Sequence, residues 1–405
     1  MITLHSKYTV RGAYVIGLGI LILLSNCGLP KKKVQITVEE TAGIARDLEY
    51  VQITLPGYTQ DFVIIKEMDD NRYIQGEKTN NSALSKNGST YLFPISINAW
   101  EKKTYSVTSF QKRVSAAPLD VKGEGAAFTV ENDYFRANFG ITDQQAADGL
   151  YPGQLSTMLL KRKQVLLERD GNNIHWSPNF QKEGLEYKTV GHMDTENLRI
   201  VEQNPYLFSV EKSGNVKGYE EIDLTVHYTF YANLPYFIYT SNMEMKKDVA
   251  LTLLRNDEMT MNRTFTHLIF PDSSGAAAYI PLYGTSQLDS LKNSPLHDNI
   301  TWVGFVNKDK SYGLISLRLG YDNKNLQNES SPLHEPHTQI SVGADEGRYW
   351  NRRLINDTNT LVPKGSRYHE KNAYLVIEDM NEIGTQIDDL LNSYKNPLKI
   401  SFSTE

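Results

Sequence analysis

The stretch that decides the fold is Glu221-Ile-Asp-Leu-Thr-Val-His-Tyr-Thr-Phe-Tyr231, in which apolar and polar side chains alternate without interruption. Successive side chains of a β-strand point to opposite faces of the sheet, so this run has one apolar and one polar face. Residues 232–235 form a turn signal, and residues 236–245 form a predicted return strand. The pattern predicts a long antiparallel hairpin, buried on one face, whose polar face carries His227 and Tyr231 and lines a concave sheet.

Further strands are predicted on the C-terminal side at 301–306, 313–319 and 373–378. Long antiparallel strands spread over nearly 300 residues favour two large stacked sheets. One helix is expected, because a stripe of apolar side chains recurs at helical spacing from Ile383 to Tyr394 before Pro397. A last strand is predicted at 398–402.

The N-terminal side carries shorter predicted strands, at 34–38, 50–55, 91–97 and 105–107, with Gly, Asn and Pro between them. The sequence therefore predicts an all-β protein. A small N-terminal β-sandwich covers 34–115, a linker follows, and a large antiparallel supersandwich with one C-terminal helix covers 120–405.

The first residues are typical of an export signal. Lys7 and Arg11 precede an apolar run at 15–24, which is shorter than the roughly 20 residues that a membrane span needs. The ending Leu24-Ser-Asn-Cys27 resembles a lipobox. We expect residues 1–26 to be a signal peptide, Cys27 to carry the lipid and residues 27–33 to form the anchored linker. A buried or nucleophilic thiol is the alternative for Cys27.

Charge and cysteine content limit the possible functions. The formal charge is −6, no Lys/Arg run is longer than the three residues of Lys31 to Lys33, and Cys27 is the only cysteine. These features exclude nucleic acid as a partner, a thiolate mechanism and a disulfide in the mature chain. The basic residues after the anchor suit contact with anionic headgroups. Bacteroidota lipoproteins, which this N-terminus resembles, usually carry an acidic stretch there for surface display, so the resemblance implies the periplasmic face of the outer membrane.

Several segments carry a family resemblance: Ala45-Arg-Asp-Leu-Glu-Tyr-Val51, Phe128-Thr-Val-Glu-Asn-Asp-Tyr-Phe-Arg-Ala137, Val362-Pro-Lys-Gly365 and Ala373-Tyr-Leu375. Their layout resembles lipoproteins of Bacteroidota-type polysaccharide-utilisation clusters. These pair a small β-sandwich with a galactose-mutarotase-like supersandwich, on which polysaccharide lyases of the rhamnogalacturonan exo-lyase type are built. The resemblance implies a carbohydrate-active, lipid-anchored envelope protein that meets an acidic polysaccharide or oligosaccharide.

A lyase of this kind cleaves beside a uronate by β-elimination. It must neutralise the carboxylate, remove the adjacent proton and protonate the leaving oxygen, for which Arg or Asn and His or Tyr are suited. A hydrolase instead needs two carboxylates that flank the scissile bond.

Residues 172–180 form the densest polar group. His175 is a candidate base, Trp176 a platform for a sugar ring, and Asn173 and Asn179 candidate partners for hydroxyl groups. The alternative is a packed loop with the indole in the core and the imidazole bonded to backbone.

A second group runs from Arg255 to His267. Polar side chains between two apolar strands are costly to bury unless they are paired. Arg255 could neutralise a uronate, Glu258 and His267 could transfer protons, and Asn262 could bind the substrate. The alternative is an exposed hairpin with an internal ion pair.

A third group lies at 347–353, where Tyr349 and Trp350 stand among arginines that include Arg352 and Arg353. Arginines suit a carboxylate or sulfate and the aromatic rings suit stacking. A cationic surface strand is the alternative.

Isolated histidines complete the candidates. His192 could bind substrate, although a single His on a strand is more often structural. No cofactor is predicted, and a divalent cation is only weakly suggested by His334-Glu-Pro-His337. No feature of the sequence specifies an oligomeric state.

The predicted function is a polysaccharide lyase, with His175 or His267 as base, Tyr349 as acid and Arg255 or Arg353 as neutraliser. Three alternatives stay open. They are a glycoside hydrolase that uses Glu258 with Asp257 or Glu131, a non-catalytic glycan-binding lipoprotein that uses Trp176, Tyr349 and Trp350, and a structural envelope protein. A single groove that gathers His175, His267, Arg255 and Tyr349 would support catalysis.

Overall fold

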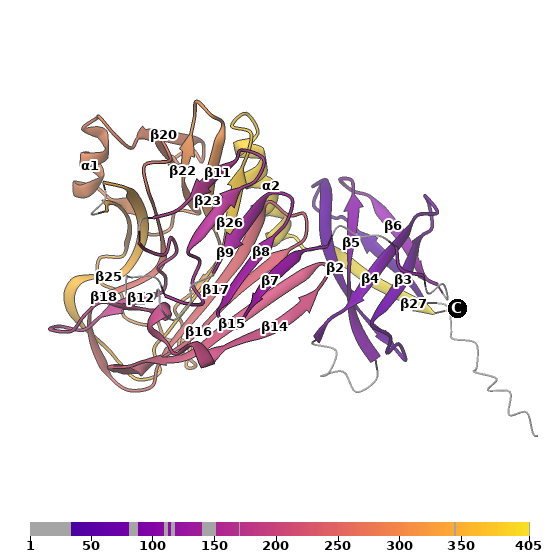
Figure 1. Cartoon of the computed structure of the whole chain (residues 1–405), viewed down its shortest axis with the longest axis horizontal. Coiled ribbons are helices and arrows are strands. Elements are labelled where there is room, and N and C mark those ends of the chain that lie inside the picture. Colours follow the sequence, from indigo (N-terminus) through magenta and orange to yellow (C-terminus); the bar gives the residue numbers. More distant parts are fainter. Residues whose placement is uncertain are drawn as a thin grey trace, which may run out of the picture.

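The computed structural model describes residues 34–80, 88–108, 112–114, 118–139, 151–169, 171–343 and 346–404. The predicted signal peptide, Cys27 and the anchored linker lie outside these residues. Within them, strands dominate and a helix precedes the C-terminal strand, which confirms the all-β prediction. Figure 1 shows a small and a large body, called here the N-terminal and the C-terminal module. In the described parts of the chain, neither helix has the length and apolar character needed to cross a bilayer.

The N-terminal module is built on one seven-stranded sheet with the order β2-β5-β4-β3-β6-β1-β27. Its core contains Ile36, Val51, Phe93 and Tyr105, all of which are buried. The strands are β1 (Val34–Glu39), β2 (Arg46–Pro56), β3 (Phe62–Glu67), β4 (Tyr73–Lys78), β5 (Gly88–Ile97), β6 (Lys102–Val107) and β27 (Lys399–Thr404).

The last strand differs from the expectation that residues 120–405 form one module. β27 pairs antiparallel with β1, with Val34 opposite Thr404, and Leu398 is buried in the N-terminal core. Without β27, β1 would be an edge strand with unpaired backbone groups. The C-terminal strand therefore covers that edge and ties the end of the chain to the first module.

A nine-stranded sheet is the centre of the C-terminal module, with the order β14-β15-β16-β17-β26-β23-β22-β19-β20. β16 contains the alternating run, and its apolar side chains are buried as predicted. The strands are β14 (Leu198–Asn204), β15 (Leu207–Val216), β16 (Tyr219–Tyr231), β17 (Tyr236–Met245), β19 (His267–Pro271), β20 (Ala277–Pro281), β22 (Trp302–Asn307), β23 (Tyr312–Asp322) and β26 (Arg367–Ile377).

Two further sheets share one hydrophobic core with the nine-stranded sheet. The six-stranded sheet contains β12 (Asn179–Gln181), β13 (Lys188–Thr189), β18 (Val249–Met261), β21 (Leu296–His297), β24 (His337–Val342) and β25 (Arg348–Val362). The five-stranded sheet contains β7 (Asp120–Glu124), β8 (Ala127–Glu131), β9 (Phe135–Asn138), β10 (Thr157–Leu160) and β11 (Val165–Leu167). Stacked antiparallel sheets agree with the predicted architecture.

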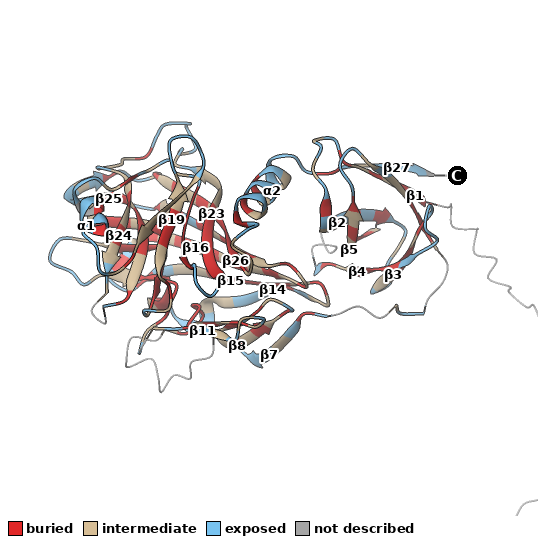
Figure 2. Cartoon of the chain, turned by 90° about the horizontal axis from the view of Figure 1, so that it is seen from above, coloured by how far each residue is buried: buried red, intermediate tan, exposed pale blue. Residues whose placement is uncertain are grey.

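The predicted helix is α2 (Ile383–Lys395), which covers the opposite face of the nine-stranded sheet. Ile383, Ile387 and Leu391 are buried there, whereas Tyr394 is 42% exposed. Figure 2 shows α2 on the side of the C-terminal module that faces the N-terminal module. A short helix, α1 (Gln287–Asn293), was not expected, because only Leu288 and Leu291 mark its buried side.

Candidate functional site

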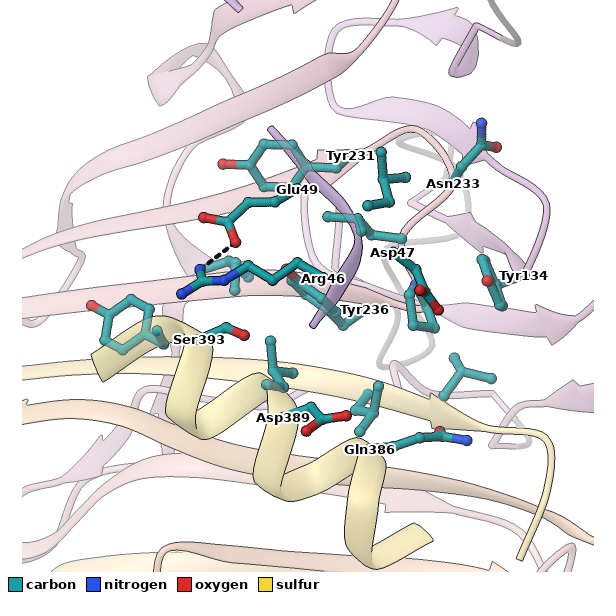
Figure 3. Close-up of a pocket in the computed structure, with 18 of the residues that line it drawn as sticks. Arg46, Asp47, Glu49, Tyr134, Tyr231, Asn233, Tyr236, Gln386, Asp389 and Ser393 are labelled. Atoms are coloured by element: carbon teal, nitrogen blue, oxygen red, sulfur yellow. Dashed lines mark hydrogen bonds and ion pairs between the residues drawn. The ribbon is translucent and has the colours of Figure 1, made fainter. Parts of the chain in front are cut away.

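A cavity of about 700 Å³ lies between the two modules and is called here the inter-module cavity. β2 forms one wall, the turn between β16 and β17 another, and β26 with α2 the third. Figure 3 shows Asp47 on the β2 side and Asp389 on α2, on opposite sides of the hollow. Ligand sites occur preferentially in such hollows between structural units.

Tyrosines form much of the cavity wall: Tyr50, Tyr134, Tyr231, Tyr236 and Tyr394. The rings of Tyr50 and Tyr231 stack with centroids 5.5 Å apart, and the Tyr50 hydroxyl donates a hydrogen bond to the Ala232 carbonyl at 2.7 Å. Burial raises the pKa of Tyr231 and Tyr236, so both hydroxyls stay neutral donors. The polar face of β16 thus reaches the cavity at Tyr231, whereas His227 on the same face does not line it.

Arg46 fixes the β2 wall. Its guanidinium binds the Glu49 carboxylate and the Asn396 carbonyl, and it lies 3.6 Å from Glu40. Burial is the largest influence on Glu40, but backbone N–H groups, including that of Trp100, outweigh it and hold the pKa at about 2. Burial raises the pKa of Glu49 in spite of Arg46. Arg46 is therefore committed to protein carboxylates.

Acidic side chains outnumber basic ones in the cavity. Its six carboxylates belong to Asp47, Glu49, Glu378, Asp379, Glu382 and Asp389, and its three cations to Arg46, Arg162 and Lys371. Arg162 is paired with Glu378 at 2.9 Å, and the Lys371 ammonium lies 4.7 Å from the centre of the Tyr394 ring. An excess of negative charge opposes the entry of an anionic ligand.

Asp389, like Glu49, is a cavity carboxyl group with a raised pKa. Burial raises its pKa first, and the charges of Asp388 and Asp47 raise it further. A carboxyl group whose pKa is raised by a nearby carboxylate is suited to donate a proton while its partner stays ionised. Asp47 and Asp389 are thus two carboxyl groups on opposite walls of a cavity that is lined by tyrosines (Figure 3).

Four predicted residues do come together elsewhere, on the outer face of the six-stranded sheet: Arg255, Glu258, Tyr349 and Arg353, called here the Arg255 cluster. Arg255 and Glu258 form an ion pair at 2.8 Å, and Asn179 donates to the same carboxylate at 3.3 Å. Although burial opposes it, Glu258 and Tyr187 raise the pKa of Arg255. Burial is the main cause that lowers the pKa of Arg353, and the positive charge of Arg255 lowers it further. Because Glu258 already neutralises Arg255, the structure contains the internal ion pair of the alternative, although in a largely buried strand and not in an exposed hairpin.

His175 is not accessible as a base. It is fully buried between the sheets, where its ring bonds to the hydroxyls of Tyr228, Tyr374 (3.0 Å) and Ser177 (2.9 Å). Burial lowers its pKa to about 3. The prediction of a substrate base here needs correction, because no substrate reaches this imidazole; it is a hydrogen-bonded core histidine.

Trp350 and Arg352 are also inside the core instead of on a binding surface. The Trp350 indole donates to Asp257 at 3.2 Å, and Arg352 binds Glu370 and Asp298, each at 2.9 Å. Both predicted substrate contacts are therefore wrong, because β25 points alternate side chains of the 347–353 stretch into the space between the sheets. Asp257 is buried as well, and burial raises its pKa to about 6, with Glu370 adding to the shift.

The other predicted contacts are dispersed. Asn173 is fully buried and binds Tyr151 backbone, while the half-buried Trp176 donates to the Asn173 carbonyl at 2.7 Å. The rings of His192 and Tyr151 pack together in a tilted arrangement, with centroids 4.1 Å apart. Burial, with Lys188 next, lowers the pKa of His192 to about 4. These residues build the loop beneath the Arg255 cluster.

The single groove expected for His175, His267, Arg255 and Tyr349 does not form. His267 begins β19 in the outer part of the nine-stranded sheet, paired with Pro281 and Val306. Asn262 accepts a hydrogen bond from Thr264 in the turn before it. Only Arg255 and Tyr349 are neighbours, because the polar residues stand on different sheets and different faces.

The alternative carboxylate Glu131 also lacks the setting that a hydrolase needs. Glu131 pairs with Arg136 and Lys161 at 2.5 and 2.9 Å, mainly through Arg136, and its pKa falls to about 2. Among the described residues, no group of three His, Cys, Asp or Glu side chains is placed to hold a metal ion.

The residues that line the inter-module cavity were largely missed. Asp47, Glu49 and Tyr50 stood in the segment 45–51, which served only for the family resemblance. Asp389 stood on the helix, where a polar residue between apolar positions is usually solvated. Only the folded structure brings these residues together, because segments that lie far apart in the chain meet at the inter-module cavity.

No protein-family model and no curated protein matches this chain. Among solved structures, it is similar to an alpha-mannosidase from Enterococcus faecalis V583, at 10% identity and a TM-score of 0.53, over 92% of this chain and 46% of that one. A glycosyl hydrolase family 38 protein from Enterococcus faecalis matches at 10% identity and a TM-score of 0.52, over 93% of this chain and 48% of that one. The chain thus spans about half the length of these structures, and at such identity the likeness establishes a shared fold.

Proposed function

We propose that this chain is a carbohydrate-active protein that takes a neutral glycan into the inter-module cavity and cleaves it by hydrolysis. The observation that carries the proposal is the hollow of about 700 Å³, walled by tyrosines and rich in carboxylates. Tyrosine rings stack on the apolar faces of sugars, and their hydroxyls and the carboxylates bind sugar hydroxyls. The names of the similar structures, an alpha-mannosidase and a family 38 glycosyl hydrolase, support this class.

Asp389 and Asp47 would perform the reaction. Asp389, whose pKa is raised by burial and by Asp388 and Asp47, donates its proton to the glycosidic oxygen as the bond from that oxygen to the anomeric carbon breaks. Asp47 accepts a proton from the water whose oxygen bonds to the anomeric carbon. The products are a reducing sugar and the alcohol of the remaining glycan.

Hydrolysis fits this site better than β-elimination. A lyase must neutralise a uronate, but the cavity has twice as many carboxylates as cations, and both of its arginines already have carboxylate partners. The Arg255 cluster offers no substitute, since Glu258 neutralises its most buried cation. Among the described residues that line the cavity, an acidic glycan would meet six carboxylates and a single cation, Lys371, that is not held by a carboxylate.

The test is cleavage of neutral oligosaccharides by wild type, Asp389→Asn and Asp47→Asn. We expect new reducing ends from wild type, a loss of at least about 100-fold in rate for either variant, and no ultraviolet absorbance of an unsaturated sugar. Asp223→Asn is the control, because Asp223 is 46% exposed on β16 and contributes nothing to the cavity. Cleavage of a polyuronate with an unsaturated product would overturn the proposal.

A binding measurement separates a second outcome. If neutral oligosaccharides bind and Tyr236→Ala abolishes the binding, but no reducing ends appear, the cavity belongs to a non-catalytic glycan-binding protein. That result would refute hydrolysis and leave the ligand class intact. Absence of both binding and cleavage would refute both.

Envelope anchoring is part of the same proposal. The predicted signal peptide and Cys27 would place the cavity at the outer membrane, on its periplasmic face. Metabolic labelling with a fatty acid should mark the wild-type chain, and Cys27→Ser should lose the label and move to the soluble envelope fraction. Retention of label by that variant would exclude Cys27 as the lipid site.

A further inference from the structure

A second, smaller hollow adjoins the inter-module cavity at the start of β2 and is called here the adjoining hollow. Its volume is about 270 Å³, and its lining includes Tyr73, Gln75 and Ser96 of the N-terminal module and Tyr206 of the C-terminal module. Ligand pockets usually measure about 300–1,000 Å³, so this hollow is small for a site of its own. Its size suits an extension of a larger site.

The two hollows meet at residues that line both of them: Asp47, Leu48, Tyr50 and Asn233. Three of these belong to β2, the edge strand of the seven-stranded sheet, and Asn233 belongs to the turn between β16 and β17. A ligand that leaves the inter-module cavity over these residues therefore enters the adjoining hollow directly.

A β-bulge places Asp47 at this boundary. Between Arg46 and Glu49 the pairing of β2 with β5 shifts by one residue, so that Asp47 and Leu48 stand opposite Ser96 alone. Bulges turn side chains away from their regular direction and are frequent beside active sites. Asp47 is exposed and lines both hollows. The proposed base thus stands where a bound chain would cross from one hollow to the other.

Tyrosine rings run from one hollow to the other. The Tyr50 ring lies 5.5 Å from that of Tyr231 in the inter-module cavity and 5.5 Å from that of Tyr206 in the adjoining hollow. The Tyr206 hydroxyl donates to the Gln75 carbonyl at 3.0 Å, which holds this ring between the modules. Tyr73 is 46% exposed, so it presents aromatic surface on which a sugar ring can pack.

The polar groups of the adjoining hollow also suit an uncharged ligand. Among the described residues that line it, Asp47 and Arg72 are the charged ones, and Arg72 is paired with the buried Glu67 at 2.8 Å. The hydroxyl of Ser96 and the amide of Asn233 are neutral groups that can both donate and accept hydrogen bonds. Such groups match the hydroxyls of a neutral sugar.

We propose that the glycan is an oligosaccharide that runs from the inter-module cavity over Asp47 and Asn233 and places a further neutral sugar unit in the adjoining hollow, beside Tyr73. This extension rests on the proposed glycan site and deepens it, because it specifies the length of the ligand. A short chain occupies the inter-module cavity alone, whereas a longer chain occupies both hollows and gains the contacts of the second.

The test is calorimetric titration of the full chain carrying Asp389→Asn, which leaves the ligands uncleaved. The probes are cellobiose and cellohexaose, maltose and maltohexaose, and mannobiose and mannohexaose. We expect the hexasaccharide of at least one series to bind at least about tenfold more tightly than its disaccharide, and Tyr73→Ala to remove most of this gain. Phe402→Ala is the matched control, because Phe402 is 52% exposed on β27 of the same module but lines neither hollow, and the gain should persist.

Ser96→Tyr provides a second variant, because the added ring fills the adjoining hollow, and it should also remove the gain. A gain with length that Tyr73→Ala abolishes supports the extension even if wild type releases no reducing ends, so hydrolysis is tested separately. If both lengths bind equally, or if both variants keep the gain, the extension is wrong although the inter-module cavity still binds a glycan. If no oligosaccharide binds, both the extension and the proposed glycan site are wrong.

Discussion

The inter-module cavity and the polar interior between the sheets are built from opposite kinds of sequence. The interior takes His175, Trp350 and Arg352 from polar stretches that stand out between apolar strands. The cavity takes Asp47, Tyr236 and Asp389 from segments with no unusual pattern, far apart along the chain. The polar residues that stood out within predicted strands are thus residues that folding buries and pairs with one another.

The physical reason is the high free-energy cost of burying an unpaired polar group. A long strand with polar residues on its inward face can fold only if partners meet them, so such residues cluster in closed networks. A hollow at the junction of two modules needs no such pairing, because water reaches it. The comparison predicts that the interior governs stability and the cavity governs ligand binding.

The largest effect should follow from breaking the ion pair between Arg352 and Glu370. Arg352→Met leaves Glu370 and Asp298 without their cation in the core, and should lower the free energy of unfolding by about 3–5 kcal/mol. Chemical denaturation measures it. Arg353→Met is the matched control on the same strand; its partner Asp357 is 75% exposed, so the loss should stay below about 1 kcal/mol. Equal losses would contradict the distinction between interior and surface.

The next largest effect is a pH dependence that arises from His175. Burial lowers its pKa from 6.5 to about 3, so the folded protein holds it neutral while the unfolded chain takes up a proton. This contribution to stability is complete above pH 6.5 and is lost as the pH falls toward 3. Between pH 6.5 and about 4.5 the loss should be roughly 2 kcal/mol.

The measurement compares denaturation of wild type and His175→Asn across that range. The variant should lose less stability on acidification than wild type, even if it is less stable at neutral pH. His337→Gln, at the start of β24, is the control and should follow wild type. Parallel curves for wild type and His175→Asn would show that the imidazole is not held neutral by the fold.

Much of the fold could be predicted from local pattern. The alternation in β16 identified a strand and its buried face, because apolar residues at every second position are characteristic of a half-buried β-strand. The apolar spacing of α2 identified a helix. The partner of β27 could not be predicted, since sheet membership depends on which edge is open after the modules meet. The short helix α1 had too few apolar positions for a periodic signal.

The site was less predictable than the fold. Sequence reasoning placed Arg255 and Glu258 in one group and Tyr349 in another, and the structure brings these three together on two paired strands. The groove that was expected to join Arg255 and Tyr349 with His175 and His267 does not form, because His175 is buried in the core and His267 lies on another sheet. Packing between the sheets decides which face of a strand is buried. It also decides whether an arginine forms an ion pair within the protein and is then unavailable to a substrate.

A smaller effect is expected at the junction of the modules. Tyr50→Phe removes the hydrogen bond to the Ala232 carbonyl and should lower the free energy of unfolding by about 1 kcal/mol. The ring stack with Tyr231 is kept, so glycan binding should persist. Tyr394→Phe is the control, as its side chain is 42% exposed and should give no measurable loss. A large drop in Tyr50→Phe would show that the junction, and not the interior, limits stability.

The smallest effect on stability, with the opposite sign, is expected at Asp389. Its pKa is raised in the folded protein by burial and by Asp388 and Asp47, so the charged form is destabilised at neutral pH. Asp389→Asn removes that charge and should raise the free energy of unfolding slightly, by about 0.5 kcal/mol, with the gain vanishing as the pH falls below the carboxyl pKa. Denaturation at pH 7 and at about pH 3 measures the difference. A gain in stability on replacing Asp389 would indicate that the residue is kept for its function in the cavity. A loss in stability would mean instead that Asp389, like Arg352, stabilises the folded protein.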